Sequence, residues 1–192
     1  MADPPGRAAS EGPLTDPPAD LERLAARVQE LALDQGVTVA TAESCTGGLV
    51  GHLITAIPGS SGYYLGGIVS YADEVKAGLL AVPVDALQRH GAVSAQVARA
   101  MAEGARASVG ADVAVAVTGV AGPEGGSEAK PVGLTYIAVA RSAGSEVQRH
   151  HWEGDRGTNK EQSAAAALRM LIETLERGDA TSPGEADPGR AP

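Results

Sequence analysis

The sequence predicts an α/β fold, a single layered domain in which helices flank a mixed β-sheet, with a disordered tail at each end. Helical and strand patterns alternate through the first half of the chain, which is typical of layered α/β domains. The continuous apolar run at 113–117 fits a strand that is covered on both faces. A hairpin pattern around Ala143-Gly144 follows and adds antiparallel strands to the sheet.

Apolar periodicity places the remaining elements. Gly36 should end the first helix, Pro83 should start a short helix that Gly91 ends, and Ser94 should cap the helix that follows. Gly66 and Gly67 indicate a bulge or a close backbone approach within the second strand. Helices are expected at 20–35, 49–58, 72–80, 84–90, 94–109 and 159–177, and strands at 37–40, 65–71, 113–117, 134–140 and 146–152.

The length of 192 residues suffices for one domain with a proper core. Phe is absent, so Val, Leu, Ile and Ala must build that core. Residues 1–19 and 178–192 are rich in small and turn-forming residues and lack an apolar face, so we expect both to be disordered tails. The folded domain is then 20–177.

Composition argues against several classes of function. A net charge of -9 disfavours direct binding to nucleic acid or to an anionic membrane. No run is long and apolar enough to span a bilayer, and no signal peptide is visible. Cys45 is the single cysteine, which excludes an internal disulfide framework and a cysteine-based zinc site. We therefore expect a cytoplasmic protein.

Small polar residues lie at 41–48, where a predicted strand leads into a helix. Backbone N–H groups at a helix start lack internal partners and favour negative charge. The hydroxyl of Ser44 could react there, and Gly47 and Gly48 would let a ligand approach the backbone. Alternatively, Ser44 or Thr46 merely caps the helix.

Further polar residues follow other strands. Tyr71 and Thr118 each end a predicted strand, and ligands of open α/β sheets bind beyond such strand ends, so both should lie near Ser44. Taken singly, each has a structural alternative. Lys76 would be a solvated surface lysine, Tyr71 a core residue, Thr118 an ordinary strand residue, and Arg156 a helix cap or a partner of its neighbouring aspartate.

Six motifs resemble the C-terminal domain of the CinA family, over about residues 22–175. They are Thr41-Ala-Glu-Ser-Cys-Thr-Gly-Gly48, Tyr71-Ala-Asp-Glu-Val-Lys76, Gly91-Ala-Val-Ser94, Ala100-Met-Ala-Glu-Gly-Ala105, Val117-Thr-Gly-Val-Ala-Gly-Pro123 and Lys130-Pro-Val-Gly133. The resemblance implies a nicotinamide-nucleotide amidohydrolase, which converts the carboxamide of nicotinamide mononucleotide (NMN) to a carboxylate and releases ammonia. The chain resembles the stand-alone form of the family.

The resemblance implies that Ser44 is the nucleophile and Lys76 its base, assisted by Tyr71. A serine needs such a base, and lysine can serve only when its pKa falls toward neutrality. N–H groups near 45–48 would hold the oxyanion. The resemblance implies no metal, no cofactor, a small-molecule nucleotide as substrate and a homo-oligomer. The substrate-binding residues would be Cys45, Thr46, Gly47, Gly48, Thr118, Gly119 and Arg156.

Two departures from the family pattern affect this site. Asp73 stands where the family often has Asn, and its carboxylate would favour the charged form of Lys76 if the two groups meet. After Arg156 the family often has an apolar and then a basic residue, and here only Lys160 fits. Cys45 is a weaker candidate nucleophile, because no matched histidine is evident.

The four histidines do not have the spacing of a zinc site. Two other functions stay open. One is a non-catalytic nucleotide-binding or partner-binding domain of the same fold, and the other is the same chemistry on a different carboxamide.

Overall fold

The computed structural model describes residues 20–178, so the predicted tails lie outside the described residues except for Gly178. The helices are α1 (Leu21–Gln35), α2 (Leu49–Ala56), α3 (Asp73–Leu80), α4 (Val84–His90), α5 (Ala95–Val109) and α6 (Arg156–Glu176), with a short 3-10 helix at Ser60–Gly62. The strands are β1 (Val39–Glu43), β2 (Tyr64–Val69), β3 (Val113–Gly119), β4 (Leu134–Arg141) and β5 (Gly144–His151).

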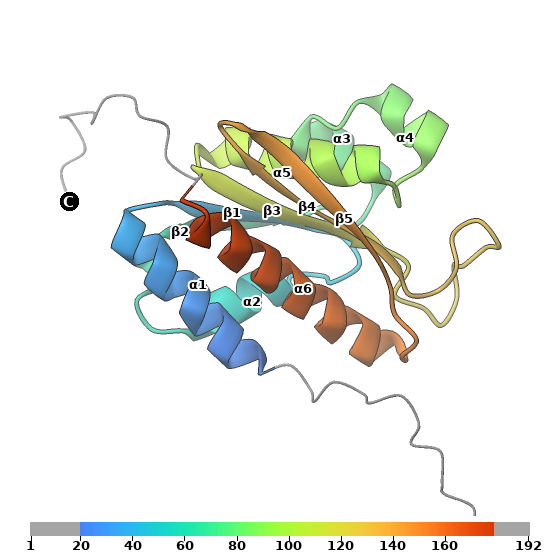
Figure 1. Ribbon diagram of the computed structural model, residues 1–192. Helices are drawn as coiled ribbons and strands as arrows, with labels where there is room; N and C mark the ends of the chain where they lie inside the picture. Colours follow the sequence, from blue (N-terminus) through green and yellow to red (C-terminus); the bar gives the residue numbers. More distant parts are fainter. Residues whose placement is uncertain (1–19, 179–192) are drawn as a thin grey trace, which may run out of the picture.

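The five strands form one mixed sheet in the order β2-β1-β3-β4-β5. β1 is parallel to both β2 and β3, whereas β3–β4 and β4–β5 are antiparallel pairs. Helices cover both faces, with α1, α2 and α6 on one side and α3, α4 and α5 on the other (Figure 1). The predicted α/β class, with a mixed sheet between helices, is confirmed.

The two faces of the sheet carry different side chains. Val113, Val115 and Val117 of β3 pack toward α1, α2 and α6, while Ala114 and Ala116 pack toward α5. β4 alternates in the same way, because successive side chains of a strand point to opposite faces. The alanine face lets α5, itself rich in buried alanine, approach the sheet closely. A core without Phe is thus filled by branched residues on one face and by close approach on the other.

The predicted irregularity at Gly66 and Gly67 is present. Val39 pairs with Tyr64 but Ala40 pairs with Gly66, so β2 contains one extra residue at this point. A Cβ at Gly67 would lie 2.2 Å from Oγ1 of Thr41, which shows the close approach that excludes a larger residue.

Most of the residues predicted to end or cap a helix are confirmed in that role. Gly36 and Gly91 follow the ends of α1 and α4, and Ser94 accepts the N–H of Val97 at the start of α5. Several boundaries were predicted wrongly by two or three residues. β2 ends at Val69, so Tyr71 lies just beyond the strand rather than at its end. β1 extends to Glu43, because both neighbouring strands pair with its last residues. α6 begins at Arg156, because Asp155 caps it by accepting the N–H of Thr158.

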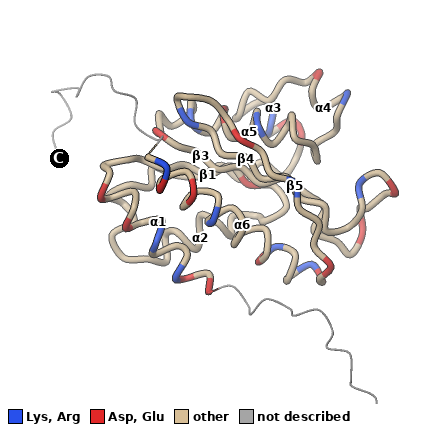
Figure 2. Tube along the Cα trace, in the orientation of Figure 1, with Lys and Arg blue, Asp and Glu red and all other residues tan. Residues whose placement is uncertain are grey.

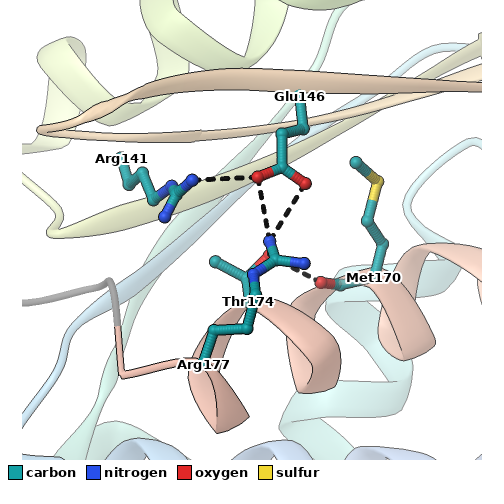
Figure 3. A network of polar contacts seen from close by, with 5 residues as sticks. All are labelled: Arg141, Glu146, Met170, Thr174 and Arg177. Carbon is teal, nitrogen blue, oxygen red and sulfur yellow. Dashed lines mark hydrogen bonds and ion pairs between the residues drawn. The ribbon is translucent and has the colours of Figure 1, made fainter.

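The C-terminal end of α6 is fastened to the β4–β5 hairpin (Figure 3). Both carboxylate oxygens of Glu146 lie 3.0 Å from Nη2 of Arg177, and Arg141 donates to the same carboxylate at 2.9 Å. Acidic and basic residues are otherwise interspersed along the described chain (Figure 2). None of its helices is long and apolar enough to cross a membrane.

Candidate active site

The carboxyl ends of β1, β2 and β3 meet at one edge of the sheet, because these three strands are parallel. A cavity of about 270 Å³ lies there. The residues that line it are Ser44, Cys45, Tyr71, Asp73, Lys76, Ala92, Val93, Thr118, Gly119, Val120, Ala121, Gly122, Glu124, Gly125 and Arg156. The expected convergence of Ser44, Tyr71 and Thr118 is therefore confirmed.

Glu43 organises the turn that carries Ser44. Its buried carboxylate accepts the N–H groups of Gly48, Val50 and Gly51, at 3.0, 3.1 and 2.8 Å. The carboxylate thus occupies the positive end of α2, where we expected a ligand or an oxyanion. Neither Ser44 nor Thr46 caps α2, since the N-cap position is Gly48 and no side-chain hydroxyl caps it.

Fewer backbone N–H groups are available to hold an oxyanion than the sequence predicted. Gly48 donates to Glu43, and Gly47 donates to the carbonyl of Ser44 at 3.1 Å. Thr46, Gly47 and Gly48 do not line the cavity, unlike Ser44 and Cys45. Within this turn of the described chain, the backbone N–H group of Cys45 is the candidate donor that belongs to a residue of the cavity lining.

Burial of Cys45 raises the pKa of its thiol to about 12, with the backbone N–H groups of Cys45 and Thr46 opposing the shift. The thiol is therefore protonated at neutral pH. Ser44, by contrast, has its backbone fixed by a hydrogen bond from its N–H to the carbonyl of Val117 at 2.9 Å. This arrangement favours Ser44 over Cys45 as a nucleophile.

Lys76 is a buried residue of α3, with 1% of its side chain exposed. Nζ donates to the carbonyl oxygens of Ser70 and Tyr71, at 2.9 and 3.2 Å, and lies 3.5 Å from Oδ1 of Asp73. The alternative of a solvated surface lysine is therefore wrong. No hydrogen bond joins Nζ to the Ser44 hydroxyl within residues 20–178.

The guanidinium of Arg156 links two walls of the cavity. It donates to the carbonyl of Gly122 at 2.8 Å and to the hydroxyl of Tyr71 at 3.2 Å. Tyr71 is 62% exposed, so it is not a core residue. Asp155 does not pair with Arg156, because it caps α6, and the Thr158 N–H lowers the pKa of its carboxyl.

Two buried polar side chains, Thr118 and Asn159, form hydrogen bonds to backbone groups around the cavity. The Thr118 hydroxyl donates to the carbonyl of Ala92 at 2.9 Å. Asn159, which is 1% exposed, donates to the carbonyl of Ala121 and accepts the N–H of Gly154. Asn159 thereby ties the start of α6 to the loop after β3. Its neighbour Lys160 lies near Gly47, with Nζ 3.9 Å from the position of a Cβ there.

Sequence reasoning missed Glu43 and Glu124. Glu43 looked like an ordinary polar residue of a turn, and only the path of the backbone brings three N–H groups to its carboxylate. Glu124 lines the cavity from the loop after β3. Within residues 20–178, no group of three His, Cys, Asp or Glu side chains is placed to hold a metal ion.

The mixed sheet and the polar cavity at its parallel strand ends define an α/β domain with a ligand site in the usual position for this class. The family model described as CinA C-terminal domain matches residues 21–175. The chain belongs to this family.

Relatives and solved structures agree with that assignment. A CinA-like protein of Geobacter metallireducens is 50% identical over 156 residues, which are 81% of this chain and 38% of that protein. A CinA-like protein of a Synechococcus species is 55% identical over 139 residues, 72% of this chain and 33% of that protein. The matched part of the chain thus spans about a third of the length of these relatives.

Among solved structures, the competence/damage inducible protein CihA of Agrobacterium tumefaciens superposes with a TM-score of 0.80 at 41% identity. The match covers 83% of this chain and 97% of that one. A CinA superfamily protein of Escherichia coli gives 0.77 at 33% identity, covering 80% and 89%.

Proposed function

We propose that the chain hydrolyses the carboxamide of NMN to nicotinic acid mononucleotide and ammonia, by a Ser–Lys mechanism. The observation that carries the proposal is that Ser44 and a buried Lys76 line the same cavity. Such a pair suits acyl transfer without a histidine. The choice of a pyridine nucleotide rests on the resemblance of the motifs around both residues to the amidohydrolases of the family.

In the first half of the reaction, the Ser44 oxygen forms a bond to the carboxamide carbon and gives its proton to the neutral amine of Lys76. The backbone N–H group of Cys45 stabilises the oxyanion. The bond from carbon to nitrogen then breaks, and Lys76 returns the proton to the departing ammonia.

In the second half, water attacks the ester carbon and gives its proton to Lys76. The bond to the Ser44 oxygen breaks, and Ser44 recovers a proton. Ser70 and Tyr71 position Lys76, since their carbonyl oxygens engage two N–H bonds of the amine and leave its lone pair for Ser44.

The substrate phosphate would bind Arg156, whose planar fork suits that geometry. Thr118 lines the cavity at the end of β3, beside the reacting residues. We also propose a homo-oligomer and a cytoplasmic location, as befits a nucleotide substrate.

The test is ammonia release from NMN by the purified chain and by Ser44→Ala and Lys76→Ala. We expect both variants to lose activity by about 10³-fold or more. Lys130→Ala is the matched control, because Lys130 is a half-buried lysine that does not line the cavity and donates to the carbonyl of His90. Cys45→Ala should keep most of the activity.

Other outcomes would favour the alternatives. Undiminished release by Lys76→Ala would remove Lys76 as the base. A folded chain that binds NMN but releases no ammonia would indicate a binding domain. Faster release from another carboxamide would keep the chemistry and change the substrate.

A further inference from the structure

We propose that Asp73 makes this site selective for carboxamides on a positively charged ring, that is N-alkylpyridinium carboxamides, over their uncharged dihydropyridine forms. The inference rests on the proposed function and deepens it. It concerns the one acidic residue of the cavity that departs from the family pattern noted above.

Asp73 lies beside Lys76 in the cavity and is partly open to solvent. It is the first residue of α3, and its side chain is 53% exposed and lines the cavity. Oδ1 lies 3.5 Å from Nζ of Lys76, and the carboxylate makes no hydrogen bond within the described chain. It therefore has accepting capacity left for a second partner.

The charges of the cavity are nearly balanced before a substrate enters. Lys76 and Arg156 contribute positive charge, and Asp73 and Glu124 contribute negative charge. The other titratable side chains in the lining are Cys45 and Tyr71. Nζ of Lys76 donates to two carbonyl oxygens, and the Asp73 carboxylate is its ion-pair partner.

A pyridinium substrate changes that balance. When its carboxamide carbon is in reach of Ser44, the ring nitrogen lies only three bonds away and so within the same small cavity. Its positive charge disfavours the neighbouring ammonium and attracts the Asp73 carboxylate. The substrate thereby takes over Asp73 as its own counterion.

An uncharged ring offers neither effect. Asp73 then stays paired with Lys76, so an uncharged ring gains no affinity from the carboxylate. A mere structural role for Asp73, as an acidic residue that stabilises the first turn of α3, would apply equally to its neighbour Glu74. Glu74 is exposed and lies outside the cavity lining, so it is the matched control.

Binding is measured first, by calorimetry at low ionic strength in a Ser44→Ala background that cannot turn over. NMN is compared with its reduced form, which keeps the carboxamide and the phosphate and loses the ring charge. We expect Ser44→Ala to bind NMN more tightly than reduced NMN. Adding Asp73→Asn should reduce this preference about tenfold. Glu74→Gln should leave the preference unchanged. Asp73→Glu, which keeps a carboxylate at this position, should retain the preference that Asp73→Asn loses.

Turnover is then measured with Ser44 intact, as the ratio of kcat/KM for the two nucleotides. Comparing this ratio between variants cancels the different intrinsic reactivity of the two carboxamides. We expect Asp73→Asn to lower the ratio and Glu74→Gln to leave it. Thermal melting of each variant confirms that it is folded.

Equal preferences in Asp73→Asn and in the parent would overturn the inference, as would an equal loss in Glu74→Gln or the absence of any nucleotide binding. The proposed reaction can fail independently of this inference. If the binding preference depends on Asp73 but the chain releases no ammonia, the charge selectivity stands and the proposed amidohydrolase activity is wrong. If the chain releases ammonia but its selectivity does not depend on Asp73, the activity stands and this inference is wrong.

Discussion

Nη2 of Arg156 lies 3.2 Å from the hydroxyl oxygen of Tyr71, and this contact joins residues that are 85 positions apart. Tyr71 follows β2, and Arg156 opens α6, so the contact bridges two elements that approach the cavity from different parts of the fold. The tyrosine is otherwise exposed. Its orientation therefore depends on a side chain that we expect to bind substrate as well.

Arg156→Lys tests the proposed phosphate contact. Lysine keeps the charge but loses the planar fork, so we expect kcat/KM for NMN to fall about 10- to 100-fold, mainly through KM. The unphosphorylated riboside should lose less than about threefold. Steady-state kinetics on both substrates checks this. Equal losses would mean that Arg156 acts through the shape of the cavity instead.

Glu43→Gln should destabilise the fold. The amide has one acceptor oxygen for three backbone N–H groups, and its NH₂ group faces other donors. We expect a loss of about 2–3 kcal/mol and a fall in Tm of about 5–10 °C. Glu22→Gln, an exposed acidic residue in the first turn of α1, should change stability by less than about 0.5 kcal/mol. Similar Tm values for both variants would contradict the role of Glu43.

Gly104→Ala should also destabilise the chain, because its Cβ would lie 1.9 Å from the carbonyl oxygen of Leu80 at the end of α3. Relieving that clash must move α5 away from α3, at a cost of about 2–3 kcal/mol. Gly78→Ala is the matched control within α3, where a Cβ meets nothing within 4 Å. It should stabilise the helix by about 0.5–1 kcal/mol. Urea unfolding separates the two outcomes.

Stability should fall in alkaline solution, partly through Cys45. Burial raises the pKa of its thiol from 9.0 to about 12, so the unfolded chain releases this proton at lower pH than the folded chain. Its contribution is complete below about pH 9 and is lost as the pH rises toward 12. Tyr63 behaves likewise, since burial raises its pKa from 10.0 to about 12.

The measurement is the free energy of unfolding in urea between about pH 8 and about pH 11. Cys45→Ala should show a shallower decline than the parent chain over this interval. Parallel curves would mean that the Cys45 thiol ionises as readily in the folded chain as in the unfolded one.

Local signals sufficed for much of the fold. The apolar run of β3 and the glycines after α1 and α4 predicted their elements, because each residue type has a direct backbone consequence. The end of β1 was missed because Thr41-Ala-Glu43 has turn-like composition, yet two neighbouring strands pair with it. Tertiary pairing there outweighs local propensity.

The site was predictable where strand ends determine it. Ser44, Tyr71 and Thr118 met as expected, since parallel strands present their carboxyl ends together. The burial of Lys76 was not evident from a short helix with a weak apolar face. Nor could the sequence show that Glu43 turns back onto α2, because that contact depends on the path of the intervening turn.

Arg156 is the last of the cavity-lining residues to be translated, since all the others lie at or before Gly125. A nascent chain is made from its N-terminus and domains fold as units. Ser44 and Lys76, which follow β1 and lie in α3, leave the ribosome well before α6 can dock through Arg156 and Asn159. The cavity is therefore incomplete until α6 has docked, and the proposed activity should begin only at that stage of folding.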